Sequence, residues 1–409
     1  MIRSPFICLK HITFAILAMG VMVVTLEVAL RVQDSYTGEV VSNRVTTDPL
    51  ISPSWYAHHE LRPLARFVGL NPDSGERVEI TTNGFGLRGS EIAVPKPAGV
   101  YRILCLGDET TFAPGIAAGK CFSGRLHQLL QQNSGREIEV INAGVPGYCP
   151  LLSYLQVKHS LLCLQPDLMI LNFDMSDVAD DHRFRRHTQH GKNAAPLACP
   201  NPAFARKKSP SSSQLVDRFL IPRWGAQRLG RLWLGHSPVD NRHDIDLKTG
   251  RYAWLKDQPP DWSIYVEHAL TPIDHLHQLA RDISSPLIVA TYPTPWQVSA
   301  TASNGKGVRA RAGIPENVRF ENAVPFETIA NFVQSRGILH CNTEQLFQTE
   351  HDPDRLFQTN AARISEEGHE LYAGELARFV IQHIPAIMND GRYPRHPTHA
   401  VHTRSTTIR

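Results

Sequence analysis

Five short apolar runs alternate with helical patterns between residues 101 and 384, and this alternation constrains the fold more than any other feature. Each run has the length of one buried strand. Strands that alternate with helices form a parallel sheet covered on both faces, with ligands at the carboxyl ends of the strands. The predicted strands are Tyr101–Leu106, Glu137–Asn142, Asp167–Phe173, Pro286–Thr291 and Gly337–Cys341. The sequence therefore predicts an α/β fold with a central parallel sheet.

The segments between these runs repeat apolar residues at helical spacing, so that each presents one apolar face. The predicted helices are Phe122–Gln132, Leu151–Leu164, Leu270–Ile283, Phe326–Arg336 and Glu366–Ile384. Each is long enough to cover part of the predicted sheet.

The N-terminus carries a nearly unbroken apolar run from Ile12 to Leu26, which continues for three apolar residues beyond Glu27. About 20 such residues cross a bilayer. The preceding Arg3 and Lys10 favour a cytoplasmic N-terminus. We expect a single-pass membrane anchor within residues 1–33, with the rest of the chain on the exported (periplasmic or extracellular) side. A cleaved signal peptide is the alternative.

Composition divides the remaining chain. Residues 34–98 are predicted to be a stalk and lead-in, and residues 99–385 the main domain. A segment at about 180–262, rich in Pro, Ser, Arg and His, interrupts the strand–helix rhythm and is interpreted as an insertion. Its basic clusters could contact an acidic glycan or lipid headgroups, but a solvated loop is the simpler interpretation. Residues 386–409 are predicted to be a disordered tail.

Charge and cysteine usage exclude several classes of function. The net charge is only +3, and no long basic run is interleaved with aromatic residues, so we expect no nucleic-acid binding. The seven cysteines are scattered without metal-ligand spacing. We therefore expect no metal site and no cofactor, and the sequence leaves one or two disulfides open.

Four strings, each at a predicted strand end or helix start, resemble conserved blocks of the SGNH/GDSL hydrolase family. A fifth string resembles the lead-in of its membrane-anchored members. The strings are RILCLGDETTFAPGI (Arg102–Ile116), INAGVPGYCPLLSYLQVK (Ile141–Lys158), PDLMILNFDMSD (Pro166–Asp177), ISEEGHELYAGEL (Ile364–Leu376) and, for the lead-in, TTNGFGLRGSE (Thr81–Glu91). The resemblance implies a flavodoxin-like three-layer α/β/α sandwich and a chemistry of ester hydrolysis or acyl transfer.

In this family a serine attacks the acyl carbon, a histidine takes its proton and an aspartate orients the histidine. Backbone and side-chain donors, including a block II glycine and a block III asparagine, stabilise the oxyanion. The resemblance places Glu109 at the serine position, Gly144 at the glycine, Ser176 at the asparagine, Ala361 at the aspartate and Arg363 at the histidine. Only the glycine is retained.

An arginine stays protonated and cannot act as a general base. Loss of a triad costs about 10⁴ to 10⁶ in turnover. We therefore predict that no catalytic residue is intact. We also predict a salt bridge between Glu109 and Arg363 across the former site.

The residues around Glu109 leave two interpretations open. Asp108, Glu109, Asp174 and Asp177 follow two predicted strands and could hold a divalent cation, although a polar loop rim is the preferred interpretation. The predicted binding residues are Asp108, Glu109, Gly144, Ser176, Asp177 and Arg363. Outside this set, Thr111 and His369 are expected to pack or cap locally.

Three functions follow as hypotheses. The first is a non-catalytic, membrane-anchored SGNH-like domain that binds an acylated surface carbohydrate or an envelope partner. The second is an ester hydrolase or O-acetyltransferase that acts on cell-surface polysaccharide with non-standard residues. The third is a carboxylate-based glycosidase that uses Asp108, Glu109 or Asp177, for which the carboxylate separation is the criterion.

Overall fold

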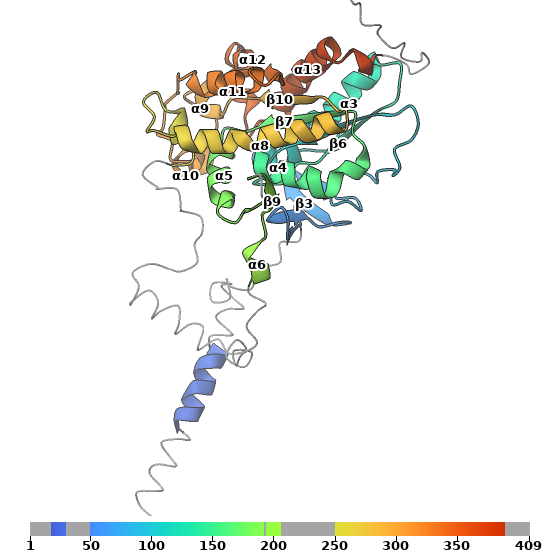
Figure 1. The fold of residues 1–409 in the computed structure, drawn as a ribbon. Coiled ribbons are helices and arrows are strands. Elements are labelled where there is room, and N and C mark those ends of the chain that lie inside the picture. The colour runs from blue at the N-terminus through green and yellow to red at the C-terminus, as the bar shows by residue number, and fades with distance from the viewer. Residues whose placement is uncertain (1–17, 30–49, 192–193, 206–249, 389–409) are drawn as a thin grey trace, which may run out of the picture.

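A computed structural model describes residues 18–29, 50–191, 194–205 and 250–388 (Figure 1). Its centre is a five-stranded sheet in the order β11-β10-β7-β5-β6, in which every neighbouring pair is parallel. Numbered along the chain, this is the order 5-4-3-1-2. Read from the other edge it is the flavodoxin-like order 2-1-3-4-5. The predicted α/β fold with a central parallel sheet is confirmed.

The sheet strands lie within one or two residues of their predicted bounds. They are β5 (Tyr101–Leu106), β6 (Ile138–Asn142), β7 (Leu168–Phe173), β10 (Leu287–Thr291) and β11 (Leu339–Asn342). Two antiparallel pairs precede the sheet and one follows β7: β1 (Ile51–Pro53) with β2 (His59–Leu61), β3 (Arg66–Leu70) with β4 (Arg77–Thr81), and β8 (Gln189–His190) with β9 (Pro196–Ala198).

The predicted helices are also present. The longer ones are α3 (Phe122–Asn133), α4 (Pro150–Gln156), α5 (Asp177–Arg185), α8 (Ser263–Asp282), α11 (Val324–Gln334) and α13 (Glu366–His383). Shorter ones are α2 (Glu109–Phe112), α6 (Pro202–Ala205), α9 (Pro295–Val298), α10 (Val308–Arg311) and α12 (Glu344–Gln348). A π-turn (Val157–Leu161) and a 3₁₀ turn (Leu162–Leu164) extend α4, and further 3₁₀ turns occupy Ala253–Leu255, Gly305–Gly307, Pro353–Leu356 and Pro385–Ile387. Helix α8 begins seven residues before its predicted start at Leu270, and it contains Pro272 in its interior.

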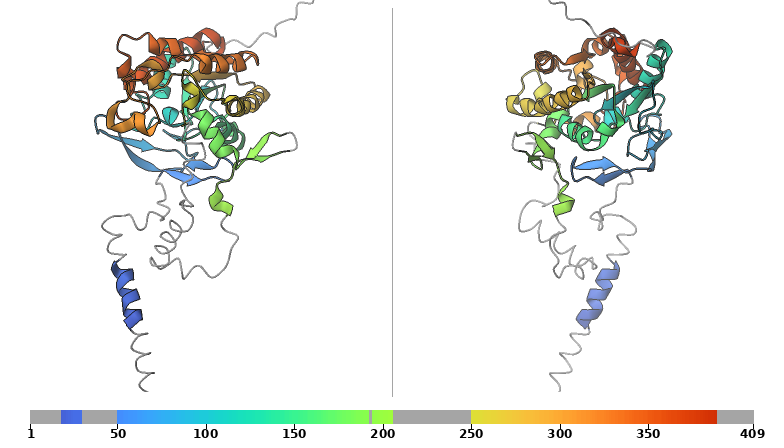
Figure 2. Two further views of the ribbon diagram at one scale, coloured as in Figure 1. Left: turned by 90° about the vertical axis from the view of Figure 1, so that its left-hand side faces the viewer. Right: turned by 45° about the vertical axis from the view of Figure 1, so that its right-hand side comes forward.

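Alternating side chains of the buried strands separate the core into two layers. In β5, Leu104 and Leu106 pack into one layer, whereas Ile103 and Cys105 pack into the other. The first layer holds α4, α5, α8 and α11, and the second holds α3 and α13 (Figures 1 and 2). Since successive strand residues point to opposite faces, this is the period expected for a sheet covered on both sides. The three-layer α/β/α sandwich is confirmed.

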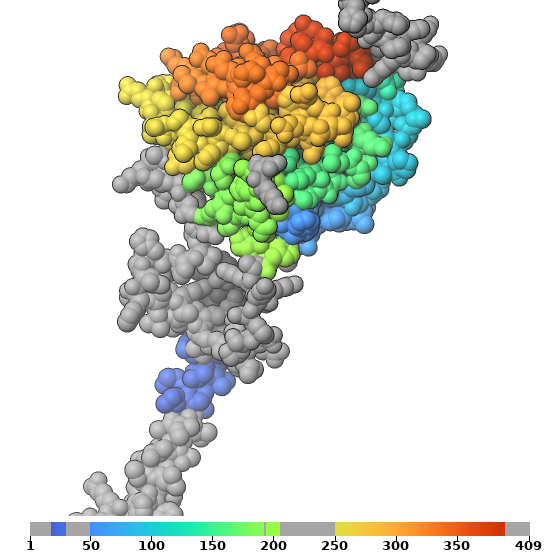
Figure 3. All heavy atoms as spheres, in the orientation of Figure 1, coloured from blue at the N-terminus to red at the C-terminus, as the bar shows by residue number. Residues whose placement is uncertain are grey.

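The lead-in forms small antiparallel sheets that pack on the main core. Leu61, Ile80 and Leu87 are buried in the same layer as α4 and α8. Figure 3 shows this blue segment at the lower edge of the folded unit, beside the yellow-green segment that contains α6. The domain boundaries themselves stay a prediction.

The terminal predictions fall largely outside the described residues. Residues 18–29 are helical, but residues 1–17, where the predicted apolar run begins, are not described. Among the helices that are described, none is long and apolar enough to cross a membrane. The predicted tail beyond residue 388 also lies outside. All six cysteines in the described ranges are free thiols, and Cys8 is outside them.

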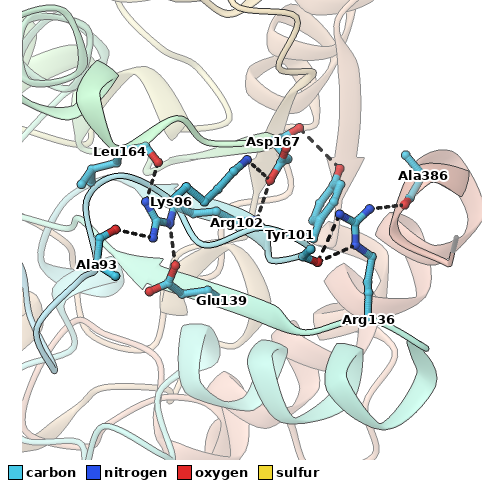
Figure 4. Close-up of polar contacts among 10 residues, drawn as sticks. Ala93, Lys96, Tyr101, Arg102, Arg136, Glu139, Leu164, Asp167 and Ala386 are labelled. Carbon is cyan, nitrogen blue, oxygen red and sulfur yellow. Dashed lines mark hydrogen bonds and ion pairs between the residues drawn. The ribbon is translucent and has the colours of Figure 1, made fainter. Parts of the chain in front are cut away.

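A buried arginine joins three strands at the amino end of the sheet (Figure 4). The fully buried Arg102 side chain donates to the carboxylate of Glu139 at 2.5 Å and to the carbonyl oxygens of Leu164 at 2.6 Å and Ala93 at 3.0 Å. The backbone N–H of Arg102 donates to Asp167, which also pairs with Lys96 at 2.6 Å. This network ties β5, β6 and the start of β7 to the lead-in.

Candidate functional site

The candidate site lies where the strand order of the sheet reverses, at the carboxyl ends of β5 and β7. Open α/β sheets bind ligands at this switch point because the loops diverge there. Asp108 and Glu109 follow β5, and Asp174, Ser176 and Asp177 follow β7. The structure thus brings the two predicted clusters to one place.

The turn after β5 depends on a glycine and a threonine. Gly107 has φ +145°, and a Cβ there would collide with Thr111 Oγ1. Thr111 Oγ1 donates to the carbonyl of Leu106 and accepts from Asn172 Nδ2 at 3.0 Å. Asp108 caps α2 by accepting from the N–H of Thr110 at 2.9 Å. The predicted local packing of Thr111 is confirmed.

Glu109, which the resemblance assigns to the serine position, is the first residue of α2, and its side chain is a hydrogen-bonded carboxylate. Its Oε2 accepts from the backbone N–H of Gly147 at 3.0 Å. Burial raises the pKa of Glu109, but the charges of Arg251 and Arg363 and the Gly147 hydrogen bond together bring the pKa below its ordinary value. The residue is therefore an anion held by built-in donors, which is a poor nucleophile and a weak base.

The predicted salt bridge between Glu109 and Arg363 is wrong in its direct form. No ion pair within 4 Å joins these two described residues, although the Arg363 charge lowers the pKa of Glu109. Both family positions on the loop before α13 are fixed through their backbone: the carbonyl of Arg363 accepts from the Gln358 N–H, and the carbonyl of Ala361 accepts from Ser303. The Arg363 charge therefore acts on Glu109 at longer range, without a direct ion pair.

Two donors expected at an oxyanion position have internal partners. The N–H of Gly144 donates to Asn142 Oδ1 at 3.1 Å. The hydroxyl of Ser176 accepts from the guanidinium of Arg251 at 2.9 Å. The Gly144 donor is therefore used within the protein, whereas the Ser176 hydroxyl is held as an acceptor by Arg251.

Arg251 is the residue that sequence reasoning missed. It comes from the far end of the insertion, forms an ion pair with Asp180 on α5 and donates to Ser176. Burial lowers its pKa, but Asp180, Tyr252 and Glu109 raise it well above the ordinary value. Burial raises the pKa of Asp180 to about 6 despite this partner. No motif marks Arg251, because its role depends on how the insertion returns to the sheet.

The remaining acids form a buried cluster beneath Glu109. Burial, followed by neighbouring carboxylates, raises the pKa of Asp108 and of Asp177 well above the ordinary range. Asp177 Oδ2 accepts from the Asp174 N–H, and Asp174 Oδ2 accepts from the hydroxyl of Tyr292 at 2.6 Å. In the described part of the chain, no group of three or more His, Cys, Asp or Glu residues is arranged to hold a metal ion. Asp108 and Asp177 are too buried to reach a substrate as a carboxylate pair.

Two histidines near the sheet rim have structural roles. His369 is buried, and its Nδ1 accepts from the N–H of Phe122 at 3.2 Å, so the predicted capping role is confirmed. His340 Nε2 lies 3.1 Å from Thr291 Oγ1, which also donates to Asn342 at 3.3 Å. This hydroxyl–imidazole pair lies at the same rim, but Thr291 is completely buried between β10 and β11. It is inaccessible to an ester, so it does not replace the missing couple.

Gly144 also has a purely steric requirement. A Cβ at this position would lie 2.7 Å from the Thr111 carbonyl carbon and closer still to the Phe112 amide nitrogen. We expect Gly144→Ala to destabilise the protein by about 1–3 kcal/mol, because the helix behind it must shift. Urea unfolding monitored by circular dichroism would measure this. Gly374→Ala, in open space on α13, is the control and is expected to stabilise by up to ~1 kcal/mol. Equal effects of the two changes would contradict the steric explanation.

A histidine pair supports the loop that carries Gly147. His59 Nε2 lies 2.8 Å from the carbonyl of Pro146, and His58 Nδ1 lies 3.1 Å from His59 Nδ1. Neutral rings satisfy both contacts when the Nε2–H of His59 donates to Pro146 and the Nδ1–H of His58 donates to His59 Nδ1. Burial, followed by the neighbouring His59, lowers the pKa of His58 to about 3, and burial lowers the pKa of His59 to about 4.

The contribution of His58 to the stability of the protein should consequently fall as the pH drops from about 6.5 toward 4. The unfolded chain binds a proton at His58 near pH 6.5, whereas the folded chain does not, so acid favours unfolding. His58→Asn, which tolerates the φ of +60°, should reduce this loss. Urea midpoints at pH 7 and pH 4.5 would test it. Asp180 changes stability with pH in the opposite direction, but it does so equally in variant and wild type. The informative quantity is therefore the difference between their pH dependences of stability, and identical slopes would contradict the role of His58.

A cavity of about 560 Å³ lies away from this cluster, beside the outer edge of β6. It is lined by residues 88–93 of the lead-in, by residues 137–142 and by the start of α3. None of the residues around Glu109 lines it.

Comparisons with known proteins return structures but no sequence family. No protein-family model matches the chain. No curated protein matches it significantly.

The solved structures to which this chain is similar include GDSL-type hydrolases and esterases. One is described as a lipolytic protein of the G-D-S-L family from Desulfitobacterium hafniense, with 12% identity, a TM-score of 0.35, and coverage of 68% of this chain and 98% of that one. Another is an acetylxylan esterase from Geobacillus stearothermophilus, with 11% identity, a TM-score of 0.36, and coverage of 68% and 94%. A third is an alpha/beta hydrolase from the metagenome of Lake Arreo, with 12% identity, a TM-score of 0.37, and coverage of 71% and 96%.

Proposed function

We propose that this protein is a membrane-anchored, SGNH-hydrolase-like domain that binds an acylated surface carbohydrate without hydrolysing it. The observation that carries the proposal is the state of Glu109. A carboxylate occupies the position of the nucleophile and accepts the Gly147 N–H, and the arginine at the position of the base faces it.

This arrangement opposes each step of serine esterase chemistry. An attacking hydroxyl and a base to deprotonate it are both replaced, and the negative charge of Glu109 stands where the oxyanion would develop. The Gly144 N–H donates internally and Ser176 is held by Arg251. The site can still bind, because the carboxylate and two guanidinium groups offer acceptors and donors to hydroxyl groups.

The choice of ligand and location follows from the sequence. The block order resembles membrane-anchored SGNH members, whose substrates are acylated polysaccharides of the cell surface. The apolar run from residue 12 supplies the proposed anchor, and the folded unit would then lie on the exported side. The alternative, an active hydrolase or O-acetyltransferase with other residues, needs a reactive hydroxyl that a covalent probe would label.

The test uses the full-length chain with O-acetylated xylo-oligosaccharides as probe. Calorimetry is expected to show saturable binding that weakens at least tenfold when the acetyl groups are removed. Acetate release and labelling by a fluorophosphonate should stay at background. Arg363→Ala should weaken binding at least tenfold, whereas Glu79→Ala, an exposed acid on β4, should leave it unchanged.

Two results would overturn the proposal. Acetate release at enzymatic rates, or a covalent fluorophosphonate adduct on any hydroxyl of the chain, would establish the alternative. Absence of binding to acetylated and deacetylated oligosaccharides alike would remove the carbohydrate ligand.

A further inference from the structure

Large apolar side chains gather on one surface of the folded unit, which we call the apolar underside. It is formed by the lead-in and by the β8–β9 hairpin with α6. Its members are Trp55, Leu64, Val68, Leu70, Leu197 and Phe204, all of them exposed. Figures 1 and 3 show β3, β9 and α6 together at the lower edge of the molecule. Exposed large apolar side chains that gather in this way are candidates for an interaction site.

The centre of the underside is held together by direct contacts. The Trp55 ring lies 5.1 Å from the ring of His159, and His159 Nε2 lies 2.7 Å from the carbonyl of Leu197. Asn201, at the start of the turn into α6, donates its N–H to the carbonyl of Ser54 at 2.9 Å. Trp55, Leu197 and the helix that carries Phe204 are therefore neighbours.

Backbone hydrogen bonds fix this arrangement. The N–H of Cys199 donates to the carbonyl of Tyr56 at 2.7 Å, and the N–H of His58 donates to the carbonyl of Cys199 at 2.6 Å. The segment after β9 thus pairs with the lead-in on both sides of Ala57. The apolar side chains project from a rigid support, where no core covers them.

Basic groups accompany the apolar ones. Lys158 lies over the Tyr154 ring and donates to the carbonyl of Pro196, next to Leu197. Arg66 and Arg77 are exposed on β3 and β4, where Arg66 faces Glu79 across the pair. Trp and Phe beside Lys and Arg is the composition of surfaces that rest in the headgroup region of a bilayer.

The chain brings this surface to a membrane if the proposed anchor holds. The described domain begins at residue 50 on the underside, and residues 30–49 connect it to the apolar helix at residues 18–29. Even when fully extended, twenty residues span at most about 70 Å. The underside is therefore the part of the domain that the connection keeps nearest to the bilayer.

We propose that the apolar underside docks on the phospholipid headgroup region, with Trp55, Leu197 and Phe204 inserted at the acyl boundary. This inference rests on the proposed membrane anchoring and extends it: the domain lies against the bilayer rather than hanging free of it. The sheet then stands above the membrane with its underside fixed.

Spin labels on the full-length chain in phosphatidylcholine–phosphatidylglycerol vesicles test this. The background variant carries Cys163→Ser, which removes the exposed thiol of the described residues, and Cys8→Ser, which removes the cysteine outside them. Single labels are placed by Leu197→Cys and Phe204→Cys, which are 46% and 47% exposed in the folded unit. Ile264→Cys and Val324→Cys, at 56% and 58% on α8 and α11, are the matched controls.

We expect a water-soluble nickel relaxing agent to reach the labels at 197 and 204 at least fivefold less than the controls, while oxygen reaches them more. If the protein floats with the vesicles but the nickel agent reaches all four labels equally, docking is overturned and anchoring is left intact. Failure of the protein to float with the vesicles would instead overturn the anchoring. Protection from nickel that grows with the protein-to-lipid ratio, without a gain in oxygen accessibility, would mean that a second copy of the chain covers the surface and would also overturn the proposal.

Discussion

A triple variant with Glu109→Ser, Ala361→Asp and Arg363→His is expected to hydrolyse chromogenic acetyl esters at least about 100-fold faster than the wild-type chain. An intact triad contributes about 10⁴ to 10⁶ in turnover, and part of that should be recovered on a framework that keeps the family geometry. Residue 109 begins α2 at the switch point, and the loop with residues 361 and 363 is pinned at Gln358 and Ser303. The Gly147 N–H freed by Glu109 becomes available to the substrate oxygen.

The measurement is release of 4-nitrophenol together with fluorophosphonate labelling mapped to residue 109. Glu109→Ser alone is the control, and we expect it to stay at wild-type background because Arg363 cannot accept the proton. If the single variant gained as much as the triple variant, another base would be present and our assignment of the histidine position would be incorrect. If the triple variant were folded but unlabelled, residues 109 and 363 would not face one another as described.

Arg102→Leu is expected to lower the free energy of unfolding by about 3–5 kcal/mol. Removing one member of a buried ion pair leaves the other without its partner, and here the buried carbonyl oxygen of Leu164 and the part-buried one of Ala93 also lose their donor. The loss should lie toward the lower end, because Glu139 is 30% exposed and water can solvate it. Equilibrium urea unfolding followed by fluorescence would measure it.

The surface pair Arg66–Glu79 supplies the control for this prediction. Its side chains are 83% and 61% exposed at 3.7 Å, so Arg66→Leu should change stability by about 0–1 kcal/mol. The loss of stability in Arg102→Lys should lie between those of Arg102→Leu and Arg66→Leu, since lysine keeps the positive charge but cannot donate to three acceptors in the guanidinium geometry. A loss below 1 kcal/mol in Arg102→Leu would show that the network in Figure 4 does not hold the sheet together.

Local pattern was sufficient for the strands and helices of the core. The β5 run matched its predicted bounds, and the other sheet strands differed by one or two residues, because a strand buried on both faces must be apolar throughout. The helix over residues 263–282 was predicted too short at its start, since Glu267 and His268 interrupt the apolar pattern before Leu270.

The placement of Asp108, Glu109, Ser176 and Asp177 at one edge also followed from the order of strands, because carboxyl ends of parallel strands meet there. Sequence reasoning did not find the contacts that decide what these groups do. Gly147, rather than Arg363, is the hydrogen-bond partner of Glu109. Gly147 was present in a quoted string and Arg363 stands directly before another, but only the loop geometry distinguishes a hydrogen bond from a charge at longer range.

By itself, the sequence determined the class of fold and the order of its strands, and through the resemblance it assigned Glu109, Ala361 and Arg363 to the serine, aspartate and histidine positions, since each is a matter of residue type and order along the chain. The tertiary structure alone decided that Arg251 returns from a distant insertion to pair with Asp180, and that apolar residues of the lead-in and of α6 meet on one surface. The physical reason is range: strand and helix patterns arise from neighbours a few positions apart, whereas burial, charge pairing and exposed patches depend on which distant segments the fold brings into contact.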